Sequence, residues 1–139
     1  MRYIKIDPDV PDLKRGTPNS AGVDLYNCDN AFTIHPGKNA IFNTGIKVEI
    51  PEGYFGLCTI RSGLGFKYGV SSHIGIIDSD YRGAMRVKIF NAGEAITIDK
   101  YERICQLVIV PYDMSEPELV DSLEESERGE NGYGSTGRK

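Results

Sequence analysis

The sequence lacks tryptophan, has only three cysteines and contains no long apolar run. Cys28, Cys58 and Cys105 are odd in number and far apart, and none of them belongs to a C-x-x-C pair. Neither a disulfide framework nor a zinc site is therefore indicated, and we expect Cys58 and Cys105 to be reduced core residues because they lie in apolar runs. No apolar stretch approaches the roughly 20 residues that cross a bilayer, so no membrane association is expected.

A basic surface is also missing. The 16 Lys and Arg residues are outnumbered by 20 Asp and Glu residues, and much of the acidic excess lies between Glu116 and Glu130. Binding along a nucleic-acid duplex needs a concentrated basic face, so we expect no nucleic-acid partner, although a few local arginines could hold a small phosphorylated ligand. Residues Met1–Ile6 are too few and too polar for a secretory signal, which predicts a cytoplasmic protein.

Helical periodicity is hard to find, and short runs with a period of two residues recur instead. The clearest strand-like runs are Ile46–Ile50, Gly53–Ile60, Met85–Ile89, Ala95–Ile98 and Ile104–Val110. The last run is almost continuously apolar, as expected of a strand that is buried on both faces. Turn signals separate the runs at His35–Gly37, Pro51–Gly53 and Asn91–Gly93. This spacing predicts an all-β fold, a jelly-roll-like β barrel, with one short helix around Leu64–Tyr68 that Gly65 disfavours.

The 139 residues leave room for one domain, which we expect to occupy residues 1–114. Residues 115–139 are expected to form a flexible tail, acidic up to Glu127 and glycine-rich from Arg128 to Gly137, because this composition buries too little apolar surface to fold alone. The end of the tail has the composition of a phosphate-binding motif. Its glycines let backbone N–H groups converge on an anion, and its polar side chains add donors, namely Arg128, Ser135 and Thr136.

Two other interpretations of the tail are weaker. A P-loop needs Lys after its second glycine, whereas Ser135 follows Gly134. A plain glycine linker is the remaining alternative. Tyr133 argues against a linker, because an aromatic ring among glycines suits stacking on a base.

Two carboxylates and one arginine are the other candidate groups. Asp78 lies in Gly75–Gly83, where a carboxylate at the end of a strand could act as general base for a water, although Asp-x-Asp before Gly also often forms a simple hairpin turn. Asp24 lies between apolar residues in Ala21–Leu25, a place where a strand rarely carries an acid without a partner or a metal-bound water. Arg61–Gly63 is a second cluster of Arg, hydroxyl and Gly after a strand.

Five segments in a fixed order decide between these interpretations. They are Ala21–Leu25, Arg61–Leu64, Gly75–Gly83, Arg103–Leu107 and Arg128–Gly137. Together they resemble the five motifs of the homotrimeric deoxyuridine triphosphate nucleotidohydrolase (dUTPase) family, and the resemblance extends from Thr17 to Gly137. It implies a jelly-roll-like β barrel, a homotrimer whose active sites are shared between subunits, Mg²⁺ as the cofactor, and hydrolysis of dUTP to dUMP and pyrophosphate.

The resemblance also implies a role for each matching residue. Asp78 corresponds to the carboxylate that activates water for in-line attack on the α-phosphorus, and Gln106 to an amide near that phosphate. Asp24 corresponds to an acid that is linked to the metal through water. Tyr81 corresponds to the ring that packs on deoxyribose and excludes a 2′-hydroxyl. The implied substrate-binding residues are Arg61, Ser62, Gly63, Ser72, Ile76, Ile77, Tyr81, Arg86, Arg128, Tyr133, Gly134, Ser135 and Thr136.

Within that set, the phosphates are assigned to Arg61–Gly63 and to the tail, and uracil to the strand backbone before Asp78 and to the Tyr133 ring. The sequence departs from the family pattern at Ser72, where bacterial relatives often have Asn, and the loop from Arg61 to Asp78 is slightly short. These departures concern uracil recognition and not the reaction.

Two other functions remain as alternatives. A dCTP deaminase shares the fold and the phosphate motifs, but it needs an acid to shuttle protons at the cytosine ring, and no Glu lies between Gly69 and Gly83. A regulatory protein that binds other proteins through this scaffold usually carries an insert, and the stretch from Asn91 to Arg103 is too short to hold one.

Overall fold

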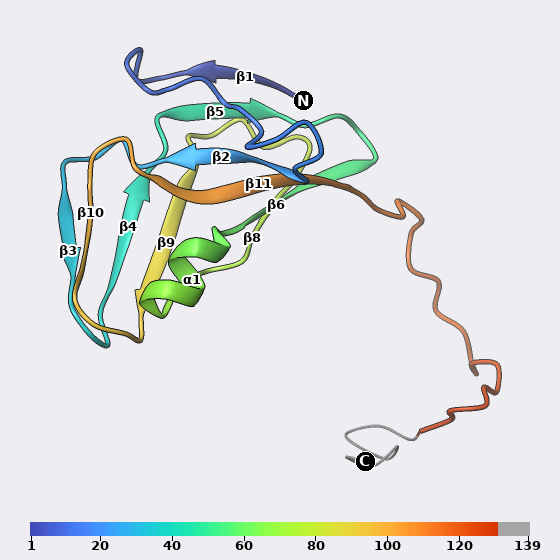
Figure 1. The fold of residues 1–139 in the computed structure, drawn as a ribbon. Helices are drawn as coiled ribbons and strands as arrows, with labels where there is room; N and C mark the ends of the chain where they lie inside the picture. The colour runs from blue at the N-terminus through green and yellow to red at the C-terminus, as the bar shows by residue number, and fades with distance from the viewer. Residues whose placement is uncertain (131–139) are drawn as a thin grey trace.

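The computed structural model describes residues 1–130 and is built almost entirely of short strands over that range (Figure 1). The strands are β1 (Arg2–Lys5), β2 (Gly22–Tyr26), β3 (Phe32–Ile34), β4 (Asn39–Asn43), β5 (Ile46–Glu49), β6 (Tyr54–Ile60), β7 (Val70–Ser72), β8 (Gly75–Ile77), β9 (Arg86–Asn91), β10 (Ile96–Ile98) and β11 (Arg103–Pro111). One helix, α1 (Ser62–Tyr68), follows β6. The predicted all-β class with a single short helix is confirmed.

The strands pair into four antiparallel sheets and not into one closed barrel. The largest sheet has the order β2-β11-β6-β8, a second has the order β4-β9-β7, and the pairs β1-β5 and β10-β3 complete the set. Partners are often distant in sequence, as β2 and β11 or β3 and β10 are, which is the connectivity of a jelly roll. The jelly-roll-like prediction is confirmed, while continuous hydrogen-bonded closure is absent from residues 1–130.

Five of these strands coincide with the runs that the sequence predicted. The observed ends of β5, β6, β9, β10 and β11 lie within two residues of the predicted ends. The expected burial of β11 on both faces is found only in part. Ile104, Cys105 and Leu107 are buried, whereas Gln106 and Val108 are half-buried, because they share the face on which the polar side chain of Asp24 lies.

The core lies between the sheets and contains fully buried side chains of β2, β4, β9 and β11, among them Leu25, Phe42, Ile89 and Leu107. Cys58 and Cys105 are buried there and free, as predicted. Contact with Cys58 and burial raise the pKa of the Cys105 thiol, so the thiol remains protonated at neutral pH.

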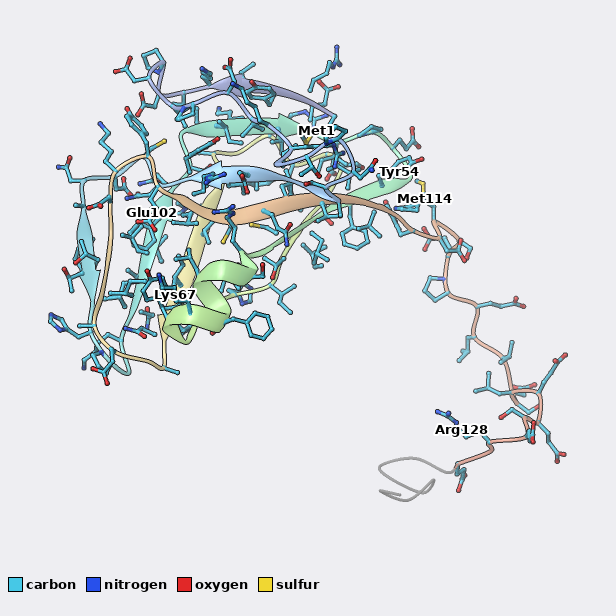
Figure 2. All side chains as sticks on the ribbon, viewed as in Figure 1. Met1, Tyr54, Lys67, Glu102, Met114 and Arg128 are labelled. Carbon is cyan, nitrogen blue, oxygen red and sulfur yellow. The ribbon has the colours of Figure 1, made fainter. Side chains whose placement is uncertain are left out.

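After β11 the chain leaves the sheets. From Tyr112 to Glu130 every residue is exposed, and this stretch contains neither helix nor strand. Figure 2 shows that the segment extends far from the body of the molecule, with Arg128 near its described end. Tyr133, Gly134, Ser135 and Thr136 lie outside the described residues. A membrane-crossing helix is not found among residues 1–130.

Candidate active site

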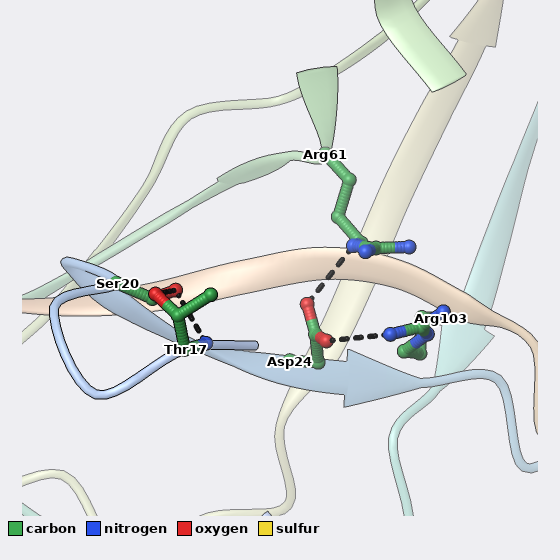
Figure 3. A network of polar contacts seen from close by, with 5 residues as sticks. All are labelled: Thr17, Ser20, Asp24, Arg61 and Arg103. Atoms are coloured by element: carbon green, nitrogen blue, oxygen red, sulfur yellow. Dashed lines mark hydrogen bonds and ion pairs between the residues drawn. The ribbon is translucent and has the colours of Figure 1, made fainter. Parts of the chain in front are cut away.

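A carboxylate and two guanidinium groups meet on one face of the β2-β11-β6 sheet (Figure 3). Arg61 Nε lies 2.9 Å from Asp24 Oδ1, and Arg103 Nη1 donates to Asp24 Oδ2 at 3.4 Å. The Asp24 side chain is only 14% exposed, while those of Arg61 and Arg103 keep 34% and 51%. The cluster has one more positive charge than negative charges, which suits an anionic ligand.

The predicted phosphate-binding motif Arg61–Gly63 lies where β6 passes into α1. Arg61 has an extended backbone just before the helix, and its N–H donates to the C=O of Ile104 on β11 at 3.2 Å. This bond ties the start of the motif to a central strand of the sheet. Ser62 and Gly63 are exposed, and the space around a Cβ at Gly63 is open, so a ligand has access to the motif.

Gln106 lies beside the same cluster. It is paired with Asp24 on one side and with Thr59 on the other, so its amide projects from the same face as the Asp24 carboxylate. A Cβ at Gly22 would lie 3.1 Å from Gln106 Oε1. Gly22 therefore makes room for the amide. In the sequence, the one signal for this role is that Gly22 lies two residues before Asp24 in the same motif.

Asp78 and Tyr81 lie in the turn between β8 and β9. Asp78 is exposed, and its backbone C=O accepts the N–H of Tyr81 at 3.2 Å. The Tyr81 hydroxyl donates to the C=O of Ala84 at 3.2 Å, and its ring crosses Gly83, where an added Cβ would collide with the phenol. The ring can lie over the turn only because residue 83 has no side chain.

A hollow of about 710 Å³ opens at this turn. Its lining includes Asp78, Asp80, Arg82, Tyr112 and Met114. Arg82 braces the turn by donating from Nη1 to the C=O groups of Ser79 and Tyr81, at 2.7 and 3.0 Å. Water therefore has free access to the Asp78 carboxylate, as a general base for water requires.

The strand before Asp78, predicted to bind uracil, is β8, which borders the gap between β8 and β9. β8 is hydrogen-bonded to β6 and has no strand on its other edge within residues 1–130, so its outward backbone groups can bind a base. A hollow of about 180 Å³ in this gap touches Ile77 and Arg86, and Ile76 is exposed beside it. Ser72, at the end of β7, has a buried hydroxyl with no hydrogen-bond partner among residues 1–130.

One chain does not bring all of these residues together. Ile77 lies opposite Gly56, and Gln106 lies opposite Thr59, three residues further along β6. With about 4.8 Å between strands and about 3.3 Å per residue, the Cα atoms of Ile77 and Gln106 are about 14 Å apart, and Asp78 is one residue further away. Arg128 of the same chain lies far from both groups (Figure 2).

The residues present fit a metal that is bound mainly by the substrate. Within residues 1–130 no three His, Cys, Asp or Glu side chains are close enough to hold a metal ion directly. Each oxygen of Asp24 contacts one guanidinium, which leaves each a lone pair for a water molecule. A magnesium ion that is held by phosphate oxygens and linked to the protein through water is compatible with this donor set.

Comparisons with known proteins agree with the motifs. The family model for dUTPase matches residues 9–137. The deoxyuridine 5′-triphosphate nucleotidohydrolase of Escherichia phage T5 is 43% identical over 147 residues, covering 98% of this chain and 99% of the phage protein. The protein of the same name from Bordetella avium is 44% identical, covering 88% of this chain and 85% of its own. The solved structure of Staphylococcus bacteriophage 80alpha dUTPase with dUPNHPP has a TM-score of 0.91 at 31% identity, covering 98% of this chain and 97% of the other. The chain therefore belongs to the dUTPase family.

Proposed function

We propose that this enzyme hydrolyses dUTP to dUMP and pyrophosphate by attack of an Asp78-activated water on the α-phosphorus, assisted by Mg²⁺. The observation that carries the proposal is the arrangement of Arg61. Its Nε is engaged by Asp24, while its terminal nitrogens have no protein partner within residues 1–130. A guanidinium held at one edge and open at the other presents a planar fork to phosphate oxygens.

The chemistry needs little more than positioning and charge neutralisation. Asp78 takes the proton of the attacking water, whose oxygen forms a bond to the α-phosphorus as the bond to the bridging oxygen breaks and pyrophosphate leaves. Arg61 and the amide of Gln106 stabilise the negative charge that spreads over the phosphate oxygens. When bound, Mg²⁺ would neutralise part of the charge on the phosphates, and Asp24 would hold it through water.

Selection of the nucleoside is assigned to β8 and to the turn that connects it to β9. Tyr81 packs on the deoxyribose and leaves no room for a 2′-hydroxyl, and its contact with Ala84 supports this placement. Backbone groups of Ile76 and Ile77 bind uracil, which the unpaired edge of β8 supports. We assign further substrate contacts to Ser62, Gly63, Ser72, Arg86, Arg128, Tyr133, Gly134, Ser135 and Thr136.

We also propose that the enzyme acts as a homotrimer with shared active sites. The Cα atoms of Gln106 and of Ile77, which precedes Asp78, are about 14 Å apart in one chain, and this supports the proposal because both groups must reach one α-phosphate. The segment after β11 gives independent support. Leu119 and Leu123 are 99% and 86% exposed in a single chain, as expected of side chains that pack on a neighbouring subunit.

The proposal is tested by pyrophosphate release from dUTP, UTP, dCTP and dTTP, each with and without Mg²⁺. We expect rapid release from dUTP alone, loss of the activity with EDTA and recovery with added Mg²⁺. Ammonia release from dCTP would instead identify a deaminase. Native mass spectrometry of the same preparation should give the mass of three chains, and an active monomer would contradict the shared site.

A further inference from the structure

We propose that Arg103 is a positioning residue, which holds the Asp24 carboxylate and through it the Arg61 guanidinium in the orientation that binds the phosphates. The inference rests on the proposed function, which gives Arg61 its ligand. It concerns a residue to which the motif comparison gave no role.

The backbone of β11 is shaped to bring Arg103 to the site. Gln106 lies opposite Asp24 and Arg103 lies opposite Tyr26, with a register shift at Ile104. Asp24 and Tyr26 are two residues apart and face the same side of the sheet. Their partners therefore also face the same side, although they are three residues apart. A regular strand would turn Arg103 away, and the β-bulge at Ile104 supplies the extra residue that turns it back.

The bulge also fixes Arg103 relative to Arg61. The C=O of Ile104 accepts the backbone N–H of Arg61 at 3.2 Å, and the Ile104 side chain is fully buried in the core. On the other side of Arg103, the C=O of Glu102 accepts the N–H of Asn27 at 2.9 Å. The backbones of Arg61 and Arg103 are therefore both fixed by the same β-bulge.

Arg103 determines how Asp24 and Arg61 meet. A carboxylate with two free oxygens favours a bidentate contact with a guanidinium. Such a contact between Asp24 and Arg61 would occupy a terminal nitrogen of Arg61. Arg103 engages Oδ2 of Asp24, which leaves Oδ1 for Arg61, and Arg61 binds it through Nε (Figure 3). The terminal nitrogens of Arg61 then stay available to the substrate.

A double-mutant cycle separates this role from a direct contact between Arg103 and substrate. We expect Arg103→Met to lower kcat/KM for dUTP about tenfold, mainly through KM, because a charge-assisted contact that orients Arg61 is lost. In an Arg61→Met background the same change should cost less than about twofold, since residues that act through one another are not additive. Arg103→Lys should restore most of the activity.

Arg2→Met is the matched control, because it removes an arginine that pairs with Glu49 on the separate β1-β5 sheet. It should leave kcat and KM unchanged. A full tenfold loss from Arg103→Met in the Arg61→Met background would overturn the proposal, since Arg103 would then act on the substrate independently of Arg61.

A second measurement does not depend on turnover. The Arg61 Nε–H, whose nitrogen lies 2.9 Å from Asp24 Oδ1, should give a slowly exchanging ¹⁵N–¹H resonance in the intact protein, which shifts and exchanges faster in Arg103→Met but not in Arg2→Met. An unchanged Arg61 resonance in Arg103→Met would overturn the positioning role even in an enzyme that hydrolyses dUTP. If the protein did not hydrolyse dUTP but the Arg61 resonance still changed in Arg103→Met, the proposed function would be wrong. Arg103 would then position Arg61 for another anion.

Discussion

Asp78 has no ion-pair partner among residues 1–130 and borders an open hollow, so its carboxylate is free to take a proton from water. Replacing it with Asn keeps its size and removes its basicity. We expect Asp78→Asn to lower kcat by about 10²–10⁴, the usual cost of losing a general base, while the affinity for a non-hydrolysable dUTP analogue changes little. Steady-state kinetics and calorimetric titration with the analogue measure the two effects.

Asp80→Asn provides the control, because it makes the same chemical change two residues further along the same turn. It should keep wild-type kcat. If Asp78→Asn turned over dUTP within a factor of a few of the wild type, another group would have to be the base.

Tyr81 owes its position to a glycine. Because a Cβ at Gly83 would collide with the phenol ring, Gly83→Ala should displace the ring from the turn and open space for a 2′-hydroxyl. We expect both Gly83→Ala and Tyr81→Ala to narrow the dUTP-to-UTP ratio of kcat/KM. Gly16→Ala, which meets only Ser20 Oγ at 3.5 Å, should leave the ratio unchanged. An unaltered ratio in Tyr81→Ala would place sugar discrimination elsewhere.

Tyr101 marks the limit of prediction from sequence at this scale. It adopts a left-handed backbone with φ of 60°, which is unfavourable for a side chain by about 1–2 kcal/mol. Its N–H bonds to the C=O of Asn27 at 2.6 Å, and its hydroxyl donates to Asp7 at 3.1 Å. Tyrosine carries no signal for this conformation, because the contacts that hold it come from distant parts of the chain.

At the scale of elements, strands with a clear period-two or continuous apolar pattern were predicted, whereas β1, β3, β4 and β7 were not. β5, β6, β9, β10 and β11 show period-two or continuous apolar patterns, whereas β1 and β7 are largely polar and have only three or four residues. The β-bulge at Ile104 was also not predictable. It appears only when β11 is paired with β2, since the run Ile104–Val110 reads as an uninterrupted strand.

Helix α1 forms although Gly65 lies inside it, because both of its ends are fixed by tertiary contacts. Its C-terminal end lies against the turn Asn91–Gly93, where a Cβ at Gly93 would collide with the backbone C=O of Tyr68. We therefore expect Gly93→Ala to lower the free energy of unfolding by about 2–3 kcal/mol, as measured by urea denaturation.

Gly65→Ala is the opposite case. Its Cβ would meet its nearest neighbours at 3.5 and 3.6 Å, which is ordinary contact, and Ala is favoured over Gly in a helix by about 1 kcal/mol. The free energy of unfolding should therefore rise. If Gly93→Ala and Gly65→Ala changed the free energy of unfolding equally, contact with the Asn91–Gly93 turn would not be what holds α1.

At the scale of the whole molecule, the order of five motifs identified the family and the fold class, because five motifs in one order are far more specific than any one of them alone. The arrangement of those groups in space could not be read from the sequence. Asp24, Arg61 and Gln106 meet on one sheet face, while Asp78 lies on the far strand of the same sheet and Arg128 far from both. This separation supports the proposal that a single chain supplies parts of different sites.

The most direct test of this account mixes two variants of low residual activity, Asp78→Asn and Arg61→Met, by unfolding and refolding them together. In a closed three-fold ring each mixed trimer contains one interface that joins an intact Asp78 to an intact Arg61 of another chain. Random equal mixing should therefore restore roughly a quarter of wild-type dUTP hydrolysis, far above the residual activity of either variant alone. Activity that stays at the level of the separate variants, with mixed trimers verified by native mass spectrometry, would contradict the shared active site.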